Sequence, residues 1–279
     1  MKRVHNPQLN KHVVLGGRKR PRVTYPHLMM HRYMADGALP PPVVSVSYET
    51  KAQAALRNIY LNDQLGDCVI AGGYHVVGVE TGNATGTPFV ATDQQIIADY
   101  GAVGGYVPGD PSTDQGCNIQ TALAHWQTVG FADGTKLKGY LSVNPTNKHE
   151  LMTALYLFEN LVFGLELPDA YVNPFPSGDG FTWGVAGAPD PSNGHCIIGA
   201  GYNTSGVGID TWALEGTFTW EAIAAYCTAS NGGEVYTVIT PDQLAKGQSV
   251  APNGFNWLTL TQDFDILGGH VAVVPKPGR

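Results

Sequence analysis

Residues 62–71 read Asn62-Asp63-Gln64-Leu65-Gly66-Asp67-Cys68-Val69-Ile70-Ala71, and this stretch decides the fold. The glycine-bearing loop ends at Asp67, which fits the N-cap of a helix that fades near Gly82. Free amide groups and the helix dipole at this position favour a thiolate, so the pattern predicts a lowered pKa for Cys68. The Asp67 carboxylate opposes that effect, because a neighbouring negative charge disfavours a thiolate.

A second stretch supplies a histidine at the start of an apolar strand, Gly194-His195-Cys196-Ile197-Ile198-Gly199-Ala200-Gly201-Tyr202. His195 follows Cys68 by 127 residues. A cysteine near the start of the helical part, with a histidine roughly 130 to 150 residues downstream, is the chain order of papain-like enzymes. Either residue alone would be an ordinary core residue, but together they predict a thiol–imidazole pair.

Over about residues 56–240 the sequence resembles the papain-like cysteine peptidases, and it is most similar to uncharacterised bacterial and phage proteins with an N-D-x-x-G-D-C motif. The resemblance implies that Cys68 is the nucleophile and His195 the general base. It also implies that Asn62 is an amide donor to the oxyanion, together with the backbone N–H of Cys68, with Gln64 as the alternative donor. Other motifs occur in the same order, namely Thr92-Asp93-Gln94-Gln95 and Gly116-Cys117-Asn118, each opening a helix.

The third member of the catalytic triad is where the sequence departs from this family. The family carries an Asn after the strand that follows the histidine, yet residues 204–230 contain no Asn. Thr211, Trp212 or Glu215 would have to orient His195, and the sequence leaves these three candidates open.

The order of helical and strand patterns predicts an α+β, papain-like fold with a helical lobe, a mostly antiparallel β lobe and a cleft between them. We expect a basic extended arm at 1–42, a papain-like body at 43–240 and a C-terminal extension at 241–279; within the body, the helical lobe spans about 56–160 and the β lobe about 161–240. Further helices are expected from Asp67, Thr92, Asn118 and Asn147 and over 220–226 and 253–268. Strands are expected over 161–167, 195–202, 207–212 and 234–240.

Charge is unevenly distributed along the chain, whose net charge is −7. Residues 1–35 hold eight of the 16 basic residues and none of the 23 acidic ones. A basic arm on an acidic body predicts contact with nucleic acid, with an acidic partner, with the body itself or with a neighbouring copy. We expect arm 1–42 to bind a protein partner or a neighbouring copy rather than nucleic acid.

Composition and motif searches exclude several classes. The 279 residues, 43% of them hydrophobic, contain no apolar run long enough to span a membrane and no signal-peptide pattern. Location in the cytoplasm or in an assembled particle is therefore expected. The four cysteines show no CxxC pattern, so we expect free thiols, no disulfide and no metal site, and the absence of phosphate-binding and dinucleotide motifs predicts no cofactor.

Two functions remain. One is a thiol hydrolase acting on peptide or amide bonds, with a peptide or protein as substrate. The other is a non-catalytic structural or assembly protein, such as a phage-particle component, that uses a papain-like body and grips neighbours through its arm.

Overall fold

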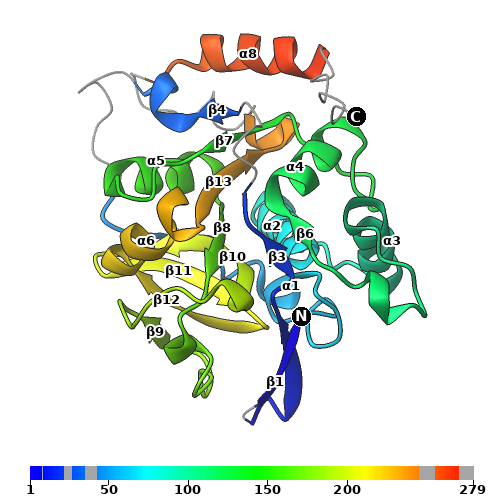
Figure 1. Ribbon diagram of the computed structural model, residues 1–279. Helices are drawn as coiled ribbons and strands as arrows, with labels where there is room; N and C mark the ends of the chain where they lie inside the picture. Colours follow the sequence, from blue (N-terminus) through cyan, green and yellow to red (C-terminus); the bar gives the residue numbers. More distant parts are fainter. Residues whose placement is uncertain (8, 22–26, 35–42, 245–254, 270–279) are drawn as a thin grey trace, which may run out of the picture.

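The computed structural model describes residues 1–7, 9–21, 27–34, 43–244 and 255–269, arranged in a helical lobe and a β lobe (Figure 1). Its α-helices are α1 (Gln53–Leu56), α2 (Cys68–Thr85), α3 (Asp93–Gly104), α4 (Ile119–Thr128), α5 (Lys148–Phe158), α6 (Trp220–Tyr226) and α8 (Trp257–Gly269). Its strands are β1 (Lys2–Asn6), β2 (Lys11–Leu15), β3 (Arg18–Lys19), β4 (Leu28–Met29), β5 (Val46–Ser47), β6 (Cys117–Asn118), β7 (Gly139–Ser142), β8 (Leu161–Glu166), β9 (Phe181–Trp183), β10 (Gly194–Tyr202), β11 (Gly206–Thr211), β12 (Leu214–Thr219) and β13 (Glu234–Ile239).

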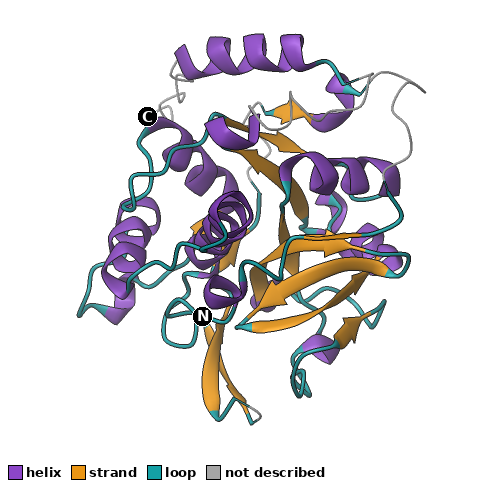
Figure 2. Ribbon diagram, turned by 180° about the vertical axis from the view of Figure 1, so that it is seen from behind, coloured by secondary structure: helices purple, strands orange, loops and turns teal. Residues whose placement is uncertain are grey.

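One large sheet forms the β lobe, and Figure 2 shows its strands from behind. The strand order is β4-β7-β13-β8-β10-β11-β12-β9, with β5 paired to β10. All pairs are antiparallel except β4–β7 and β9–β12. The predicted α+β class with a mostly antiparallel β lobe is therefore confirmed. In the β8–β10 register His195 lies opposite Leu165, so the histidine sits beside the last residues of β8.

The central helix of the helical lobe is α2, which is buried along most of its length. A helix that is apolar all round is expected in a core rather than at a surface. Two glycines bring it close to its neighbours: a Cβ added at Gly78 would lie 2.1 Å from the Cβ of Ala55, and one at Gly82 would lie 2.4 Å from the carbonyl oxygen of Lys51. Gly82 is thus a packing residue, and the helix continues to Thr85.

Three of the predicted helix starts are confirmed by their caps. Thr92 forms a capping box at α3, and Asn118 and Asn147 each accept a hydrogen bond from a backbone N–H in the first turn of α4 and α5. Asp67 differs, since it occupies the N-cap position of α2 but its side chain makes no capping hydrogen bond. It accepts a hydrogen bond from the Asn62 side chain instead, at 3.2 Å.

The four predicted strands and the helix at 220–226 are confirmed to within one or two residues. Strand β12 was not expected. It follows β11 through a two-residue turn at Trp212 and Ala213, whose φ values of 51° and 63° lie in the left-handed region. Glycine and asparagine normally signal such a turn, and neither is present here.

The arm differs from the expected extended segment. Strands β1 and β2 form an antiparallel hairpin, and β3 then pairs in parallel with β6 at Arg18 and Cys117. Figure 1 shows β3 running between the helical lobe and the strands of the β lobe. The β1–β2 hairpin extends from the body (Figure 1), whereas β3 and β4 pair with strands of the body, one of the contacts considered for the arm. Its binding of a partner or a neighbouring copy stays a prediction.

The C-terminal helix α8 lies against the segment that follows β4 (Figure 1). The Tyr33 hydroxyl donates to Asp263 at 2.7 Å, and the Asn256 N–H donates to the Tyr33 carbonyl at 2.8 Å. Leu260 and Phe264, four residues apart on one face of this helix, are both buried. The sequence also indicates a short apolar tail at 271–274, which lies outside the described residues. Within those residues, no helix has both the length and the apolar character that crossing a bilayer requires.

Candidate active site

Cys68 is the first residue of α2, and its side chain is 2% exposed. The loop before it turns at Tyr60 and Leu61, whose φ values of 49° and 66° are left-handed. The backbone N–H of Cys196 on β10 approaches the Cys68 sulfur from the other lobe and favours its thiolate form. The fold therefore places the thiol at the junction of the two lobes.

His195, the second residue of β10, is 1% exposed. Its Nε2 is hydrogen-bonded to the Thr211 hydroxyl at 2.8 Å. The Trp212 ring stacks on the imidazole, with centroids 4.4 Å apart and planes 21° from parallel. Nδ1 is buried and has no hydrogen-bond partner among the residues described. Of the three candidates for orienting His195, Thr211 supplies the hydrogen bond and Trp212 the stacking face.

A cavity of about 10 Å³ joins the two residues, since Cys68 and His195 both line it. Asn62, Thr211 and Trp212 also contribute to its wall. A volume of this size admits about one water molecule. The fold thus brings together, around one small cavity, residues that the sequence analysis had selected between positions 62 and 212.

Burial dominates the protonation of the pair. It raises the pKa of Cys68 to about 12, and the Asp67 carboxylate acts in the same direction. Burial also lowers the pKa of His195 to about 3. The expected lowering of the Cys68 pKa by the helix start is therefore wrong for this closed state, because desolvation outweighs the helix dipole. At neutral pH the pair is a neutral thiol beside a neutral imidazole.

Asn62 is buried, and its amide is already in use. Its Nδ2 donates to the Asp67 carboxylate at 3.2 Å and to the Leu65 carbonyl at 3.3 Å. These bonds tie the loop together immediately before Cys68. Gln64, the alternative oxyanion donor, is exposed on the outer side of the same loop, where its backbone carbonyl accepts a hydrogen bond from Arg3.

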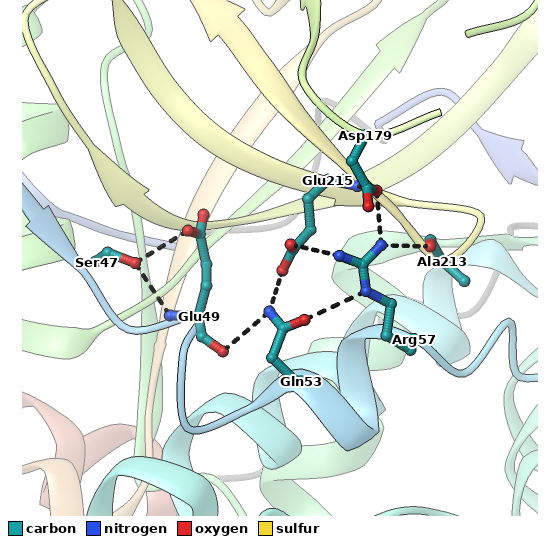
Figure 3. Close-up of polar contacts among 7 residues, drawn as sticks. All are labelled: Ser47, Glu49, Gln53, Arg57, Asp179, Ala213 and Glu215. Atoms are coloured by element: carbon teal, nitrogen blue, oxygen red, sulfur yellow. Dashed lines mark hydrogen bonds and ion pairs between the residues drawn. The ribbon is translucent and has the colours of Figure 1, made fainter. Parts of the chain in front are cut away.

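Glu215, the remaining candidate for orienting His195, belongs to a different cluster, shown in Figure 3. It accepts hydrogen bonds from Arg57 at 2.9 Å and from Gln53 at 2.6 Å. Arg57 also donates to Asp179 at 2.6 Å. The carboxylate of Glu215 is thus engaged by Arg57 and Gln53, away from the imidazole.

Two residues that the sequence analysis did not select line the same cavity, His75 and Asp210. His75 Nδ1 lies 3.4 Å from the Asp210 carboxylate, and its Nε2 is hydrogen-bonded to the Asn58 carbonyl at 2.8 Å. Burial raises the pKa of Asp210 well above its ordinary value and lowers that of His75 to about 4. The seven-residue spacing from Cys68 to His75 on one helix face was the available sequence signal.

The arm covers this site. The Val14 N–H donates to the Asn62 carbonyl at 3.2 Å, and the Gly16 N–H donates to the Gly194 carbonyl at 3.0 Å. Gly17 lies against the helical-lobe rim, where a Cβ on it would stand 2.5 Å from the Gly66 carbonyl oxygen. The arm backbone therefore spans both rims, at residues adjacent to the cysteine and the histidine.

The four cysteines are all free and buried, in agreement with the expectation of no disulfide. Within the described part of the chain, no three His, Cys, Asp or Glu side chains are grouped so that they could hold a metal ion.

No protein-family model and no curated protein matches this sequence, but solved structures match its fold. The chain is similar to xylellain, a cysteine protease from Xylella fastidiosa, with a TM-score of 0.61, 14% identity and coverage of 81% of this chain and 96% of that one. It is also similar to procathepsin L2 from the larval midgut of Tenebrio molitor (TM-score 0.56, 10% identity, 81% and 78% coverage). A third is the Amb a 11 cysteine protease of ragweed pollen in its proform (TM-score 0.51, 12% identity, 73% and 68% coverage). The protein thus has the papain-like cysteine protease fold.

Proposed function

We propose that this protein is a thiol hydrolase that cleaves peptide or amide bonds, with Cys68 as nucleophile and His195 as general base and acid. The observation that carries the proposal is the shared cavity of Cys68 and His195, which lie 127 residues apart in sequence. The hydrogen bond from His195 to Thr211 and the stacked Trp212 ring support it, because a catalytic imidazole needs a fixed orientation.

The reaction follows from this arrangement. With the Nε2 proton donated to Thr211, Nδ1 of His195 accepts the thiol proton, and the Cys68 sulfur attacks the substrate carbonyl carbon. The Cys68 backbone N–H and the Asn62 amide stabilise the oxyanion. His195 returns the proton to the leaving amine as the C–N bond breaks, which leaves a thioester. Water then attacks the thioester carbonyl and gives a proton to His195; the C–S bond breaks, the carboxylic acid product leaves, and His195 returns the proton to the Cys68 sulfur.

Two changes must precede catalysis. The arm has to leave the rims formed by Gly66 and Gly194, because a substrate has to reach Cys68, which is only 2% exposed. The Asn62 amide has to turn from the Asp67 carboxylate towards the oxyanion. Solvent entry then relieves the burial that holds the thiol neutral.

A peptide-library digestion by the full-length chain tests the proposal. Wild-type protein is compared with Cys68→Ser and with Cys227→Ser, which removes another buried free thiol that does not line the cavity. We expect cleavage by wild type and Cys227→Ser and none by Cys68→Ser. Cleavage that survives Cys68→Ser would refute the assignment.

The second candidate, a non-catalytic assembly protein of the cytoplasm or of a particle, is favoured by one observation. The arm closes the site with regular backbone hydrogen bonds, and the thiol beneath it is neutral. On this alternative the arm exchanges onto a neighbouring copy. This alternative predicts that an arm variant such as Arg18→Ala changes the oligomeric state, measured as the molecular mass in solution. It also predicts that Cys68 stays inert to alkylation in that variant.

A further inference from the structure

Arg18 is buried, whereas the other lysines and arginines in the described part of the arm are exposed. Its side chain is fully buried, and that of Glu234 at the start of β13 is 5% exposed. Nε and Nη2 of Arg18 both donate to Glu234 Oε1, at 3.0 and 2.6 Å, and Nη1 donates to the Gly232 carbonyl at 2.6 Å. The guanidinium is therefore held by one carboxylate oxygen and one carbonyl at the end of a pocket.

The pocket depends on a missing side chain in β8. A Cβ placed on Gly164 would lie 2.6 Å from Arg18 Nε, 2.8 Å from the Ile119 side chain and 2.9 Å from Glu234 Cγ. Gly164 faces Glu234 in the β8–β13 register. The sheet thus leaves a slot for the arginine stem between the two lobes.

The backbone that carries Arg18 into the pocket lies against residues close to Cys68 and His195 in sequence. Gly17 lies against Gly66, two residues before Cys68, and its carbonyl accepts a hydrogen bond from the Cys117 N–H at 2.9 Å. The Arg18 carbonyl oxygen would stand 2.4 Å from a Cβ on Gly194, the residue before His195. A chain that lies along these rims therefore directs one side chain into the Glu234 pocket.

We propose that the Glu234 pocket is a binding subsite for an arginine side chain of the peptide substrate, and that Arg18 fills it in the closed state. This inference rests on the proposed hydrolase function and names its substrate class. The fork of donors on a guanidinium reaches both Oε1 of Glu234 and the Gly232 carbonyl, whereas an ammonium is a single point charge. An apolar side chain would leave the buried carboxylate unpaired, which is unfavourable.

A second arm contact shows why Arg18 and not Arg20 marks the subsite. Arg20 donates to Glu166 through Nε and, at 3.0 Å, through Nη2, but its side chain is 63% exposed. An ion pair on the rim is worth little and selects weakly. Lys19, between the two arginines, is exposed and provides a matched control.

The test measures binding without turnover, by fluorescence anisotropy of a labelled peptide with one arginine and of the same peptide with citrulline, its neutral isostere. The protein is the full-length Cys68→Ser chain that also carries Arg18→Ala or, as control, Lys19→Ala. We expect the Arg18→Ala protein to bind the arginine peptide at least tenfold more tightly than the citrulline peptide. We expect Glu234→Gln to abolish the difference, and the Lys19→Ala protein to bind as weakly as Cys68→Ser alone. Equal binding of the two peptides, or a preference that survives Glu234→Gln, would overturn the proposal.

A rescue measurement covers the case in which Arg18→Ala folds poorly. Ethylguanidinium should raise the melting temperature or refolding yield of Arg18→Ala more than ethylammonium at the same concentration, and should have no such effect on Arg18→Ala/Glu234→Gln. Equal effects of the two salts contradict a guanidinium pocket. Failure of the proposed function looks different: arginine-selective binding would remain, but Cys68 would cleave nothing. Conversely, hydrolysis without arginine preference would refute the subsite alone.

Discussion

Two polar clusters lie at the β11–β12 turn, and they differ in how well their groups are paired. Around Arg57, the guanidinium and the carboxylates of Glu215 and Asp179 form a connected set of hydrogen bonds at a part-exposed edge (Figure 3). Around Cys68, Nδ1 of His195 and Nε1 of Trp212 are buried and lack a hydrogen bond within the described structure. The buried Asp210 oxygens also lack one there, and the nearest charged partner of this carboxylate is Nδ1 of His75, at 3.4 Å.

Among the described residues, unpaired buried polar groups are therefore found around Cys68 and not around Arg57. Buried unsatisfied donors and acceptors are rare and costly, and a site that concentrates them is a candidate for function. The cluster around Arg57 joins α1 to β12 through satisfied contacts and requires no functional explanation. The cluster around Cys68 has its unpaired polar atoms on residues that line the cavity shared by Cys68 and His195.

His195→Ala should produce the largest effect, because it removes the only proton acceptor assigned to the thiol. We expect the rate of peptide cleavage to fall by about 100-fold or more. His149→Ala on α5 is the control, and its rate should match wild type. A cleavage rate that His195→Ala leaves within a factor of two would mean that another group activates Cys68.

Acid should weaken the closed state through its buried histidines. The folded pKa of His195, about 3, lies below its ordinary value of 6.5, so the unfolded chain binds more protons between these two values. Stability contributed by neutral His195 is complete above pH 6.5 and declines as the pH falls towards 3. Between pH 7 and pH 5 wild type should lose about 2 kcal/mol more than His195→Asn, as measured by urea unfolding. Parallel losses in the two proteins would show that His195 is not buried as a neutral ring.

Thr211→Val tests the orienting hydrogen bond with nearly unchanged volume. Leaving Nε2 of His195 buried without its partner should cost about 1–3 kcal/mol of stability and lower kcat about tenfold, with KM little changed. Thr217→Val on β12 should do neither. If Thr211→Val keeps the wild-type kcat and pH profile, then Thr211 does not position the imidazole.

Arg57→Ala should have the smallest effect, although it removes several contacts. Part-exposed ion pairs contribute about 0–1 kcal/mol each, and the Arg57 side chain is 39% exposed. We expect a small drop in melting temperature and an unchanged cleavage rate. A loss of activity comparable to that of Thr211→Val would place the cluster around Arg57 in the catalytic machinery and remove the contrast between the two clusters.

Local features of the molecule were predictable from the sequence. The caps at Thr92 and Asn118 depend on interactions within four residues, which sequence patterns report directly. The start of α2 at Cys68 was also predicted, although Asp67 makes no capping hydrogen bond there. The pairing of Cys68 with His195 was predicted from the order and spacing of the two residues along the chain, and not from hydrophobic periodicity.

Long-range placements were not predictable in the same way. The hydrogen bond between His195 and Thr211 depends on the register of β10 with β11, which contains a shift between Gly199 and Gly201. The arm's route depends on the slot at Gly164, which a strand pattern does not reveal. The β1–β2 hairpin did carry a signal, since turn-forming residues at positions 6–10 separate its two strands.

The most direct test of the Cys68–His195 pair is the pH dependence of alkylation. Full-length wild type, Arg18→Ala and Arg18→Ala/His195→Ala are treated with iodoacetamide, and each modified cysteine is identified by mass spectrometry, with Cys117, Cys196 and Cys227 as internal references. The pair predicts that Cys68 alone reacts below about pH 8 once Arg18→Ala loosens the arm, and that this reactivity disappears without His195. A Cys68 that stays as inert as the other three in Arg18→Ala, or that follows an ordinary thiol titration unaffected by His195→Ala, would contradict it.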